Sequence, residues 1–186
     1  MIALIVLMVI VVAVLMVVIG TYNRLVALRQ TANNAYADVD VQLKQRQDLI
    51  PNLVETVKGY AAHERGTLDE VIAARAAAAG ATNIEGKVAA ENALTGALGK
   101  LFAVAEAYPD LKANQNFMQL QAQLGDIENK LAAARRFFNN AVAEFNAQAQ
   151  SFPAVLFAAS MGFTQRDFFD LGEGRAAAQA APQVKF

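Results

Sequence analysis

The N-terminal apolar run constrains the fold of this chain more than any other feature. Between Ile2 and Ile19 there is no polar or charged side chain. As a helix rising 1.5 Å per residue, this segment would span roughly 27 Å, close to the hydrocarbon core of a bilayer at about 30 Å. It therefore predicts a transmembrane helix over residues 1–20. The membrane-spanning positions include Ile2, Leu7, Val12, Val17 and Ile19.

The residues that flank this segment predict whether it is cleaved and how it is oriented in the membrane. A cleaved signal peptide would begin with basic residues and end in a small-x-small site, and this segment has neither. We therefore expect it to be retained as an anchor. The first cationic side chains, Arg24 and Arg29, follow it just after Tyr22. Because Lys and Arg are enriched on the cytoplasmic side, the sequence predicts a single-pass protein with its N-terminus outside and its body in the cytoplasm.

The charge balance and the absence of cysteine exclude several classes of function. The chain has 16 Lys and Arg against 17 Asp and Glu, so it lacks the basic field that holds a nucleic-acid backbone. It has no cysteine and a single histidine, His63. Disulfides, thiolate nucleophiles and cysteine-based metal sites are therefore excluded, and we expect no nucleic-acid partner.

The remaining chain carries helical periodicity. Apolar residues recur by threes and fours, and no stretch alternates with period two for long enough to form a strand. The predicted class is all-α, with a bundle over 21–171 and a flexible C-terminal tail over 172–186. Its helices are expected at about 21–79, 86–108, 110–150 and 153–160. The helix over 110–150 has the most regular apolar stripe, and only an antiparallel partner of comparable length, the first helix, can bury it.

Pro51 interrupts the first helix without disturbing its apolar seam. A proline removes the backbone hydrogen bond to the carbonyl four residues earlier, here that of Gln47, at a cost of about 3 kcal/mol in an isolated helix interior. Yet Ile50, Leu53 and Val57 stay in phase across it. The sequence therefore predicts a kink at Pro51 within one continuous helix.

A series of short motifs follows the apolar segment in a specific order. They are Tyr22-Asn-Arg-Leu-Val26, a block over 38–54 that contains Leu49-Ile-Pro-Asn-Leu-Val54, Val57-Lys-Gly-Tyr60, His63-Glu64, Arg135-Arg-Phe-Phe-Asn139, Phe145-Asn146, Phe152-Pro153, and Gly162-Phe163 with Phe168-Phe169. With these motifs the chain resembles the LemA family of bacterial membrane proteins over residues 1 to about 171. The family often has tyrosines where this chain has Phe137, Phe138 and Phe145, so a role that needs a phenolic hydroxyl is not carried over.

The resemblance implies a single-pass protein of the bacterial inner membrane with a long antiparallel helical bundle and no assigned enzymatic activity. Some relatives act in membrane-organelle formation, and others are tied to neighbouring membrane proteins and proteases. The family supplies no catalytic residues.

The interaction candidates come from the signature motifs. They are Arg46, Asp48, Ile50, Pro51, Asn52, Arg135 and Arg136. Arg46 occupies a seam position, where its methylenes can lie on the core or its guanidinium can pair with a carboxylate such as Glu128; both interpretations are favoured over ligand binding. Arg135 and Arg136 form a solvated pair or, alternatively, contact anionic lipid or a partner.

No motif supplies a catalytic, cofactor-binding or metal site. His63-Glu64 lacks the second histidine of a zinc-protease helix, since Thr67 stands at that position, and a structural histidine is favoured. Three aspartates do not share one helix face: Asp38, Asp40 and Asp48. We expect no cofactor, no metal and no small-molecule substrate.

The aromatic residues near the C-terminus can dock in three ways. They are Phe152, Phe157, Phe163, Phe168 and Phe169. Packing on the same protomer is favoured over packing on another subunit or on a membrane surface, because the basic face of a membrane-surface helix is missing.

The sequence favours a structural role over an enzymatic one. We expect a membrane-anchored helical scaffold, with coiled-coil-like seams, that self-associates into a homo-oligomer and organises or shapes membrane or membrane-protein partners. The alternative is an accessory docking subunit of a membrane protease or transporter. The expected partners are the lipid bilayer, further copies of the chain and other membrane proteins.

Overall fold

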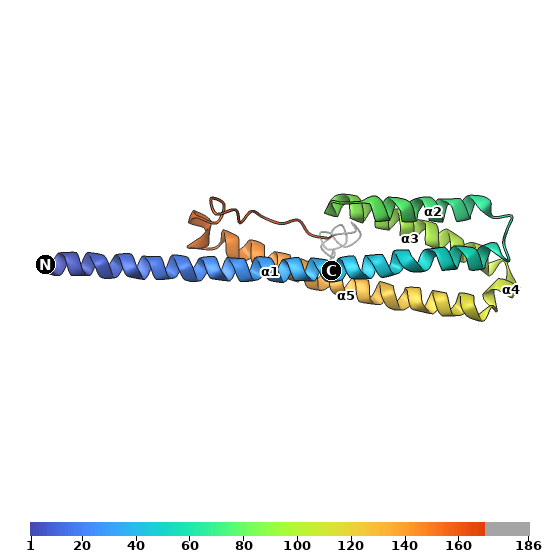
Figure 1. The fold of residues 1–186 in the computed structure, drawn as a ribbon, viewed down its shortest axis with the longest axis horizontal. Coiled ribbons are helices and arrows are strands. Elements are labelled where there is room, and N and C mark those ends of the chain that lie inside the picture. Colours follow the sequence, from blue (N-terminus) through green and yellow to red (C-terminus); the bar gives the residue numbers. More distant parts are fainter. Residues whose placement is uncertain (170–186) are drawn as a thin grey trace, which may run out of the picture. The chain divides into compact units, whose positions relative to one another are not determined.

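The computed structural model describes residues 1–169. It contains five α-helices and a short 3₁₀ turn, and the helices are labelled in Figure 1. These are α1 (Ile2–Lys58), α2 (Arg65–Gly80), α3 (Ile84–Glu106), α4 (Pro109–Lys112), α5 (Gln115–Gln150) and the 3₁₀ turn Ala154–Leu156. The described residues form no strand, which confirms the all-α class. The tail expected over 172–186 lies outside the described residues.

The chain divides into two compact units, each built partly from α1 and partly from α5. The first unit comprises residues 1–38 and 135–168, and the described part of the second comprises residues 39–134 and residue 169. The division into an anchor, a bundle and a tail at 1–20, 21–171 and 172–186 stays a prediction.

In the first unit, α5 runs antiparallel to α1. The Tyr36 ring contacts the Phe138 ring, with centroids 5.3 Å apart, whereas Arg24, nearer the N-terminus of α1, pairs with Glu144, further along α5. The antiparallel order agrees with the expectation that the helix predicted over 110–150 packs along the first helix. The side chains that share the core of this unit are Leu25, Leu28, Phe145, Ala149, Ala154, Ala158 and Phe163.

After α5 the chain turns back along the first unit. Gly162 has a φ of +79°, a left-handed conformation that an L side chain rarely adopts, and this redirects the chain toward the buried Phe163. Residues 163–168, named here the C-terminal strap, are held by Asn146, whose side chain donates to and accepts from the backbone of Arg166 at 2.9 Å. A helix was expected over 153–160, but the structure has only the 3₁₀ turn there.

The second unit buries a core between α2, α3 and the adjoining parts of α1 and α5. Its core includes Ile50, Leu53, Val71, Leu94 and Phe117, one or more from each of these helices. The α3 helix begins where Asn83 Oδ1 accepts from the Gly86 amide at 2.7 Å. A Cβ at Gly86 would lie 2.6 Å from that oxygen, so a larger residue here would require the capping side chain to shift.

The first helix ends earlier than the sequence predicts. A single helix was expected over 21–79, but α1 ends at Lys58 and α2 begins at Arg65. The turn starts at Gly59, a residue that costs about 1 kcal/mol in a helix interior. It also brings Leu68 into one core with Val54 and Val57, whereas a straight helix would separate Leu68 from Val54 by about 21 Å. The prediction was wrong because folding back buries apolar surface on both sides of the turn.

Pro51 lies inside α1, so the predicted continuity is confirmed. The bend expected there stays a prediction. The helix expected over 110–150 is divided into α4 and α5 instead. The division falls at Asn114, whose Oδ1 accepts from the Phe117 amide at 3.0 Å and so caps α5.

Candidate functional site

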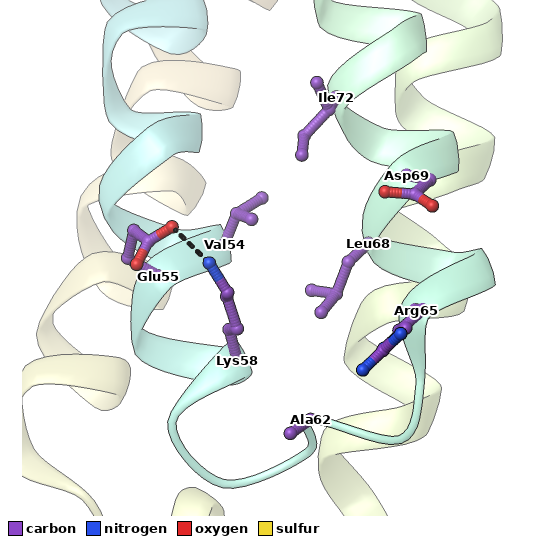
Figure 2. Close-up of a pocket in the computed structure, with 8 residues that line it drawn as sticks. All are labelled: Val54, Glu55, Lys58, Ala62, Arg65, Leu68, Asp69 and Ile72. Carbon is purple, nitrogen blue, oxygen red and sulfur yellow. Dashed lines mark hydrogen bonds and ion pairs between the residues drawn. The ribbon is translucent and has the colours of Figure 1, made fainter.

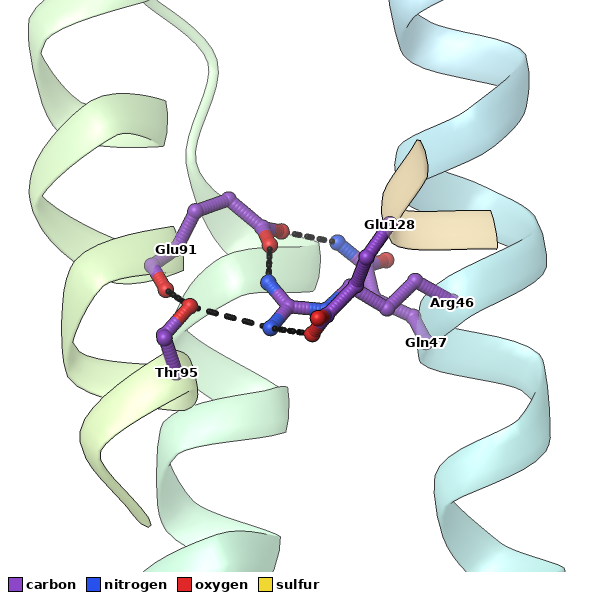
Figure 3. Close-up of polar contacts among 5 residues, drawn as sticks. All are labelled: Arg46, Gln47, Glu91, Thr95 and Glu128. Carbon is purple, nitrogen blue, oxygen red and sulfur yellow. Dashed lines mark hydrogen bonds and ion pairs between the residues drawn. The ribbon is translucent and has the colours of Figure 1, made fainter. Parts of the chain in front are cut away.

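Arg46 is the centre of the most connected polar cluster in the second unit (Figure 3). Its side chain is 3% exposed. Its Nη1 donates to Glu91 Oε2 at 2.7 Å, and its Nη2 donates to Glu128 Oε1 at 3.0 Å and to Thr95 Oγ1 at 2.9 Å. One guanidinium therefore joins α1 to α3 and α5.

The partners of Arg46 are themselves hydrogen-bonded. Gln47 Nε2 donates to Glu91 Oε1 at 3.1 Å, so both carboxylate oxygens of Glu91 are bonded. The Thr95 hydroxyl donates to the Glu91 carbonyl at 2.9 Å while accepting from Arg46. Arg46 Nε is buried and has no hydrogen-bond partner among residues 1–169. The cluster is thus nearly satisfied, as a buried charge requires.

The two carboxylates of the cluster have different surroundings. The Glu91 side chain is 4% exposed, whereas that of Glu128 is 49% exposed and stays hydrated. Arg46 therefore neutralises one buried carboxylate and only touches a solvated one. A guanidinium stays protonated in proteins, and each carboxylate accepts a hydrogen bond from a donor. The arrangement braces three helices; it does not offer a free acid, base or nucleophile.

Glu128 is the partner that the sequence suggested for Arg46, but Glu91 is the buried one and was missed. A signal for it exists in the sequence. Glu91 lies three residues after Val88 and three before Leu94, so it occupies an apolar seam position on α3 as Arg46 does on α1. Two opposite charges at seam positions of different helices indicate a buried pair.

The effect of Pro51 is on the hydrogen bonding of the Gln47 carbonyl, and Pro51 itself forms no ligand site. Its missing amide leaves the Gln47 carbonyl without the usual donor of an α-helix. Arg75 of α2 takes this place, and its Nε donates to the Gln47 carbonyl at 3.0 Å. The hydrogen bond lost within α1 is thus replaced by one between α1 and α2.

The other signature candidates do not converge on one site. Ile50 is buried in the core. Pro51 and Asn52 are exposed, and exposed Asp48 pairs with Lys44 at 3.2 Å. Arg135 is half-buried and Arg136 is exposed, both in the first unit. An interaction role for any of these residues stays a prediction.

An open groove of about 350 Å³ lies between the end of α1 and the start of α2 (Figure 2). Its apolar lining is Val54, Ala62, Leu68 and Ile72, and its charged lining is Glu55, Lys58, Arg65 and Asp69. Glu55 and Lys58 pair with each other at 3.3 Å on one side. Next to the groove, His63 is exposed in the turn. Among residues 1–169, no three His, Cys, Asp or Glu side chains are grouped so that they could hold a metal ion.

The N-terminal part of α1 is apolar and unburied. Every side chain from Ile2 to Val17 is exposed. By length and composition this is a helix that can cross a membrane.

Comparison with known proteins gives the family. The LemA family model matches residues 35–186. The magnetosome protein MamQ of Magnetospirillum gryphiswaldense is 25% identical over 174 residues, which is 80% of this chain and 64% of the relative. Magnetosome protein MamQ 2 of Paramagnetospirillum magneticum is 24% identical over 185 residues, covering 86% and 68%. Protein LemA of Metamycoplasma hominis is 24% identical over 140 residues, covering 73% and 63%. The chain therefore spans about two thirds of the length of these relatives. Because the family model covers most of its residues, the chain belongs to the LemA family.

Proposed function

We propose that this protein is a membrane-anchored helical scaffold that self-associates and organises or shapes membrane or membrane-protein partners. The observation that carries the proposal is α1 itself. Its exposed apolar residues 2–19 continue without a break into the helix that forms the core of the first unit at Leu25 and Leu28. An unbroken helix transmits the orientation of an anchor to the packed unit, whereas a flexible linker would not.

The proposed location is the bacterial inner membrane, with the N-terminus outside and the body in the cytoplasm. Arg24 and Arg29 directly after the span support this orientation. The relatives are named magnetosome proteins and a LemA protein; these are not names of enzymes, and they support a structural role.

Exposed apolar side chains outside the anchor support self-association. Val41, Ile72, Met118 and Phe137 are each about half exposed on helices. The formal net charge of -1 adds little repulsion between copies. These residues offer surfaces for contacts between helices of different copies.

Native mass measurement of the full-length protein in lipid nanodiscs tests the proposal. We expect discrete oligomers, and we expect cross-linking in membranes to give a ladder. Because the chain has no cysteine, single cysteines at Met118 and Phe137 can be cross-linked without background, with the exposed polar position Gln121 as the control. A strictly monomeric protein without a cross-linked ladder would rule out self-association.

The alternative is an accessory docking subunit of a membrane protease or transporter. The groove between α1 and α2 favours it, because an apolar floor with a charged rim is typical of surfaces that bind partner proteins. Affinity capture from native membranes would then yield one stoichiometric partner. Ile72→Glu in the groove should abolish this capture, whereas Met118→Glu, at a similarly exposed position outside it, should not. Capture that is unchanged by Ile72→Glu would argue against the groove.

A further inference from the structure

The turn after α5 carries apolar side chains that the protein does not cover. Phe152 is 80% exposed, Leu156 is 73% exposed and Val155 is 54% exposed, and Met161 is also exposed. The small residues between them, Ala154 and Ala158, are buried in the core of the first unit. The turn therefore has a packed side and a bare apolar side. The sequence favoured packing of the C-terminal phenylalanines on the protomer, which holds for Phe163 but not for Phe152.

This turn lies close to the end of the apolar span. The Phe163 ring meets the Tyr22 ring edge-on, with centroids 5.4 Å apart. Tyr22 follows Ile19 by three residues, which is about 4.5 Å along a helix. Ala154 and Ala158 share their core with Leu25, about 9 Å from Ile19 by the same measure. The interfacial layer of a bilayer is about 5–8 Å thick on each side. If residues 2–19 fill the hydrocarbon, the contacts at Tyr22 and Leu25 place the turn in this layer or at its outer edge.

Charges around the turn are arranged as a membrane interface requires. From Phe145 to Gln165 the sequence has no ionisable side chain. The charges nearest the span in this unit come from α1 and α5: Arg24, which is exposed and pairs with Glu144 at 2.8 Å, and Arg29, which covers the Phe163 ring at 4.9 Å. Beyond the turn, Arg166 Nη1 donates to Asn33 Oδ1 at 2.6 Å. Asn33 follows Ile19 by 14 residues, about 21 Å, so Arg166 points away from the span. The turn has no charge of its own to bury on entering the headgroup region, and the exposed Arg24 and Glu144 can stay hydrated among the headgroups.

We propose that residues 152–161 are a second membrane contact, in which Phe152, Val155 and Leu156 enter the interfacial region of the leaflet where α1 emerges. The proposal rests on the membrane anchoring of α1 proposed above. The lipid surface is the occupant because the bare side chains continue the apolar surface of the span. One helix leaves a protein free to rotate about the bilayer normal and to tilt, and a second contact restricts both. The contact is apolar, so it requires no anionic lipid and changes little with salt.

Tryptophan fluorescence of the full-length protein in vesicles tests this inference. The chain has no tryptophan, so each variant reports one position. Leu156→Trp probes the turn and Val12→Trp probes the anchor. Phe137→Trp is the matched control away from the bilayer, whether its surface meets water or another copy of the chain. It is 55% exposed in the same unit, and its neighbour Phe138 contacts Tyr36. Tyr36 lies about 25 Å from the end of the span along α1.

The vesicles consist of phosphatidylcholine, with and without phosphatidylcholine brominated near the headgroup end of its acyl chains. Leu156→Trp and Val12→Trp should lose emission on bromination, and Phe137→Trp should not. A quenched Val12→Trp with an unquenched Leu156→Trp overturns the second contact and leaves anchoring intact. If that Leu156→Trp emission is nevertheless blue-shifted, a second protein chain covers the turn, which also overturns the proposal. An unquenched Val12→Trp refutes the anchoring itself. Phe152→Trp repeats the measurement at a second exposed position of the turn.

Discussion

Arg46→Met should strongly destabilise the second unit. It removes the cation from Glu91, whose side chain is 4% exposed, and leaves only the bond from Gln47. Removing one partner of a buried ion pair costs about 3–5 kcal/mol. Glu91→Leu should cost less, about 2–3 kcal/mol, because Arg46 keeps Glu128 and Thr95.

The double variant separates pairing from packing. Arg46→Met with Glu91→Leu replaces the buried pair by apolar side chains of similar size, and such replacements are often neutral or stabilising by about 1–4 kcal/mol. We expect it to be at least as stable as the wild type. Glu128→Gln is the control, since its side chain is 49% exposed, and it should change stability by less than about 1 kcal/mol.

Urea unfolding of the full-length protein in detergent, followed by far-ultraviolet circular dichroism, measures these differences. Urea is preferred to guanidinium chloride because a salt would screen the charges being tested. The reasoning would be refuted if the urea concentration at the midpoint of unfolding were the same for Arg46→Met and the wild type. It would also be refuted if the double variant were as unstable as the two single changes added together.

Other polar contacts lead to predictions of the same kind. Arg75→Met should cost about 1.5–3 kcal/mol in urea unfolding, because it removes a charged donor from the carbonyl that Pro51 leaves free, and it should cost less in a Pro51→Ala background, where an amide can take that carbonyl. Asn146→Leu removes two hydrogen bonds to the C-terminal strap and should cost about 2 kcal/mol by the same assay. Burial and the hydrogen bond to Glu64 raise the pKa of Tyr108 above its usual 10.0; an absorbance titration should show one tyrosine ionising late, and this step should vanish in Tyr108→Phe. Because the fold favours the neutral phenol, this stabilisation is complete below pH 10 and is lost as the pH rises.

Each of these predictions has a result that contradicts it. An equal cost of Arg75→Met with and without Pro51 would show that the two residues are not coupled. Arg136→Met, at an exposed position, should stay within about 0.5 kcal/mol of the wild type and serves as its control. Asn129→Leu, at another exposed position, is the control for Asn146→Leu and should also have little effect. If Tyr108→Phe kept the late step and lost amplitude only at lower pH, the raised pKa of Tyr108 would be excluded.

The sequence by itself determined the helical class and the apolar span. Both depend on spacing within a single segment: the length of the uncharged run from Ile2 to Ile19, and the recurrence of apolar side chains by threes and fours. The order of α1 against α5 in the first unit could also be predicted, because so long a stripe has few partners that can bury it.

Only the tertiary structure decided where the first helix ends. Pro51 is the stronger local signal for a break, yet α1 continues through it, because Arg75 supplies a donor to the exposed carbonyl. Gly59 is the weaker signal, yet the helix stops there. Local propensity is worth about 1–3 kcal/mol at either residue, and contacts with residues far along the chain outweigh it.

The candidate site, too, could be predicted only in part from the sequence. Arg46 could be singled out from the sequence, because the apolar pattern of its own helix is enough to show a charged residue at a seam position. Its buried partner Glu91 lies 45 residues away, and its contact with Arg46 depends on the turns that set α3 beside α1 in the second unit. The same holds for the bare turn at Phe152 and Leu156, where composition shows that the side chains are apolar and only packing decides which of them are covered. Short-range patterns determine which residues are unusual; the free energy of burial, summed over distant segments, determines what each of them contacts.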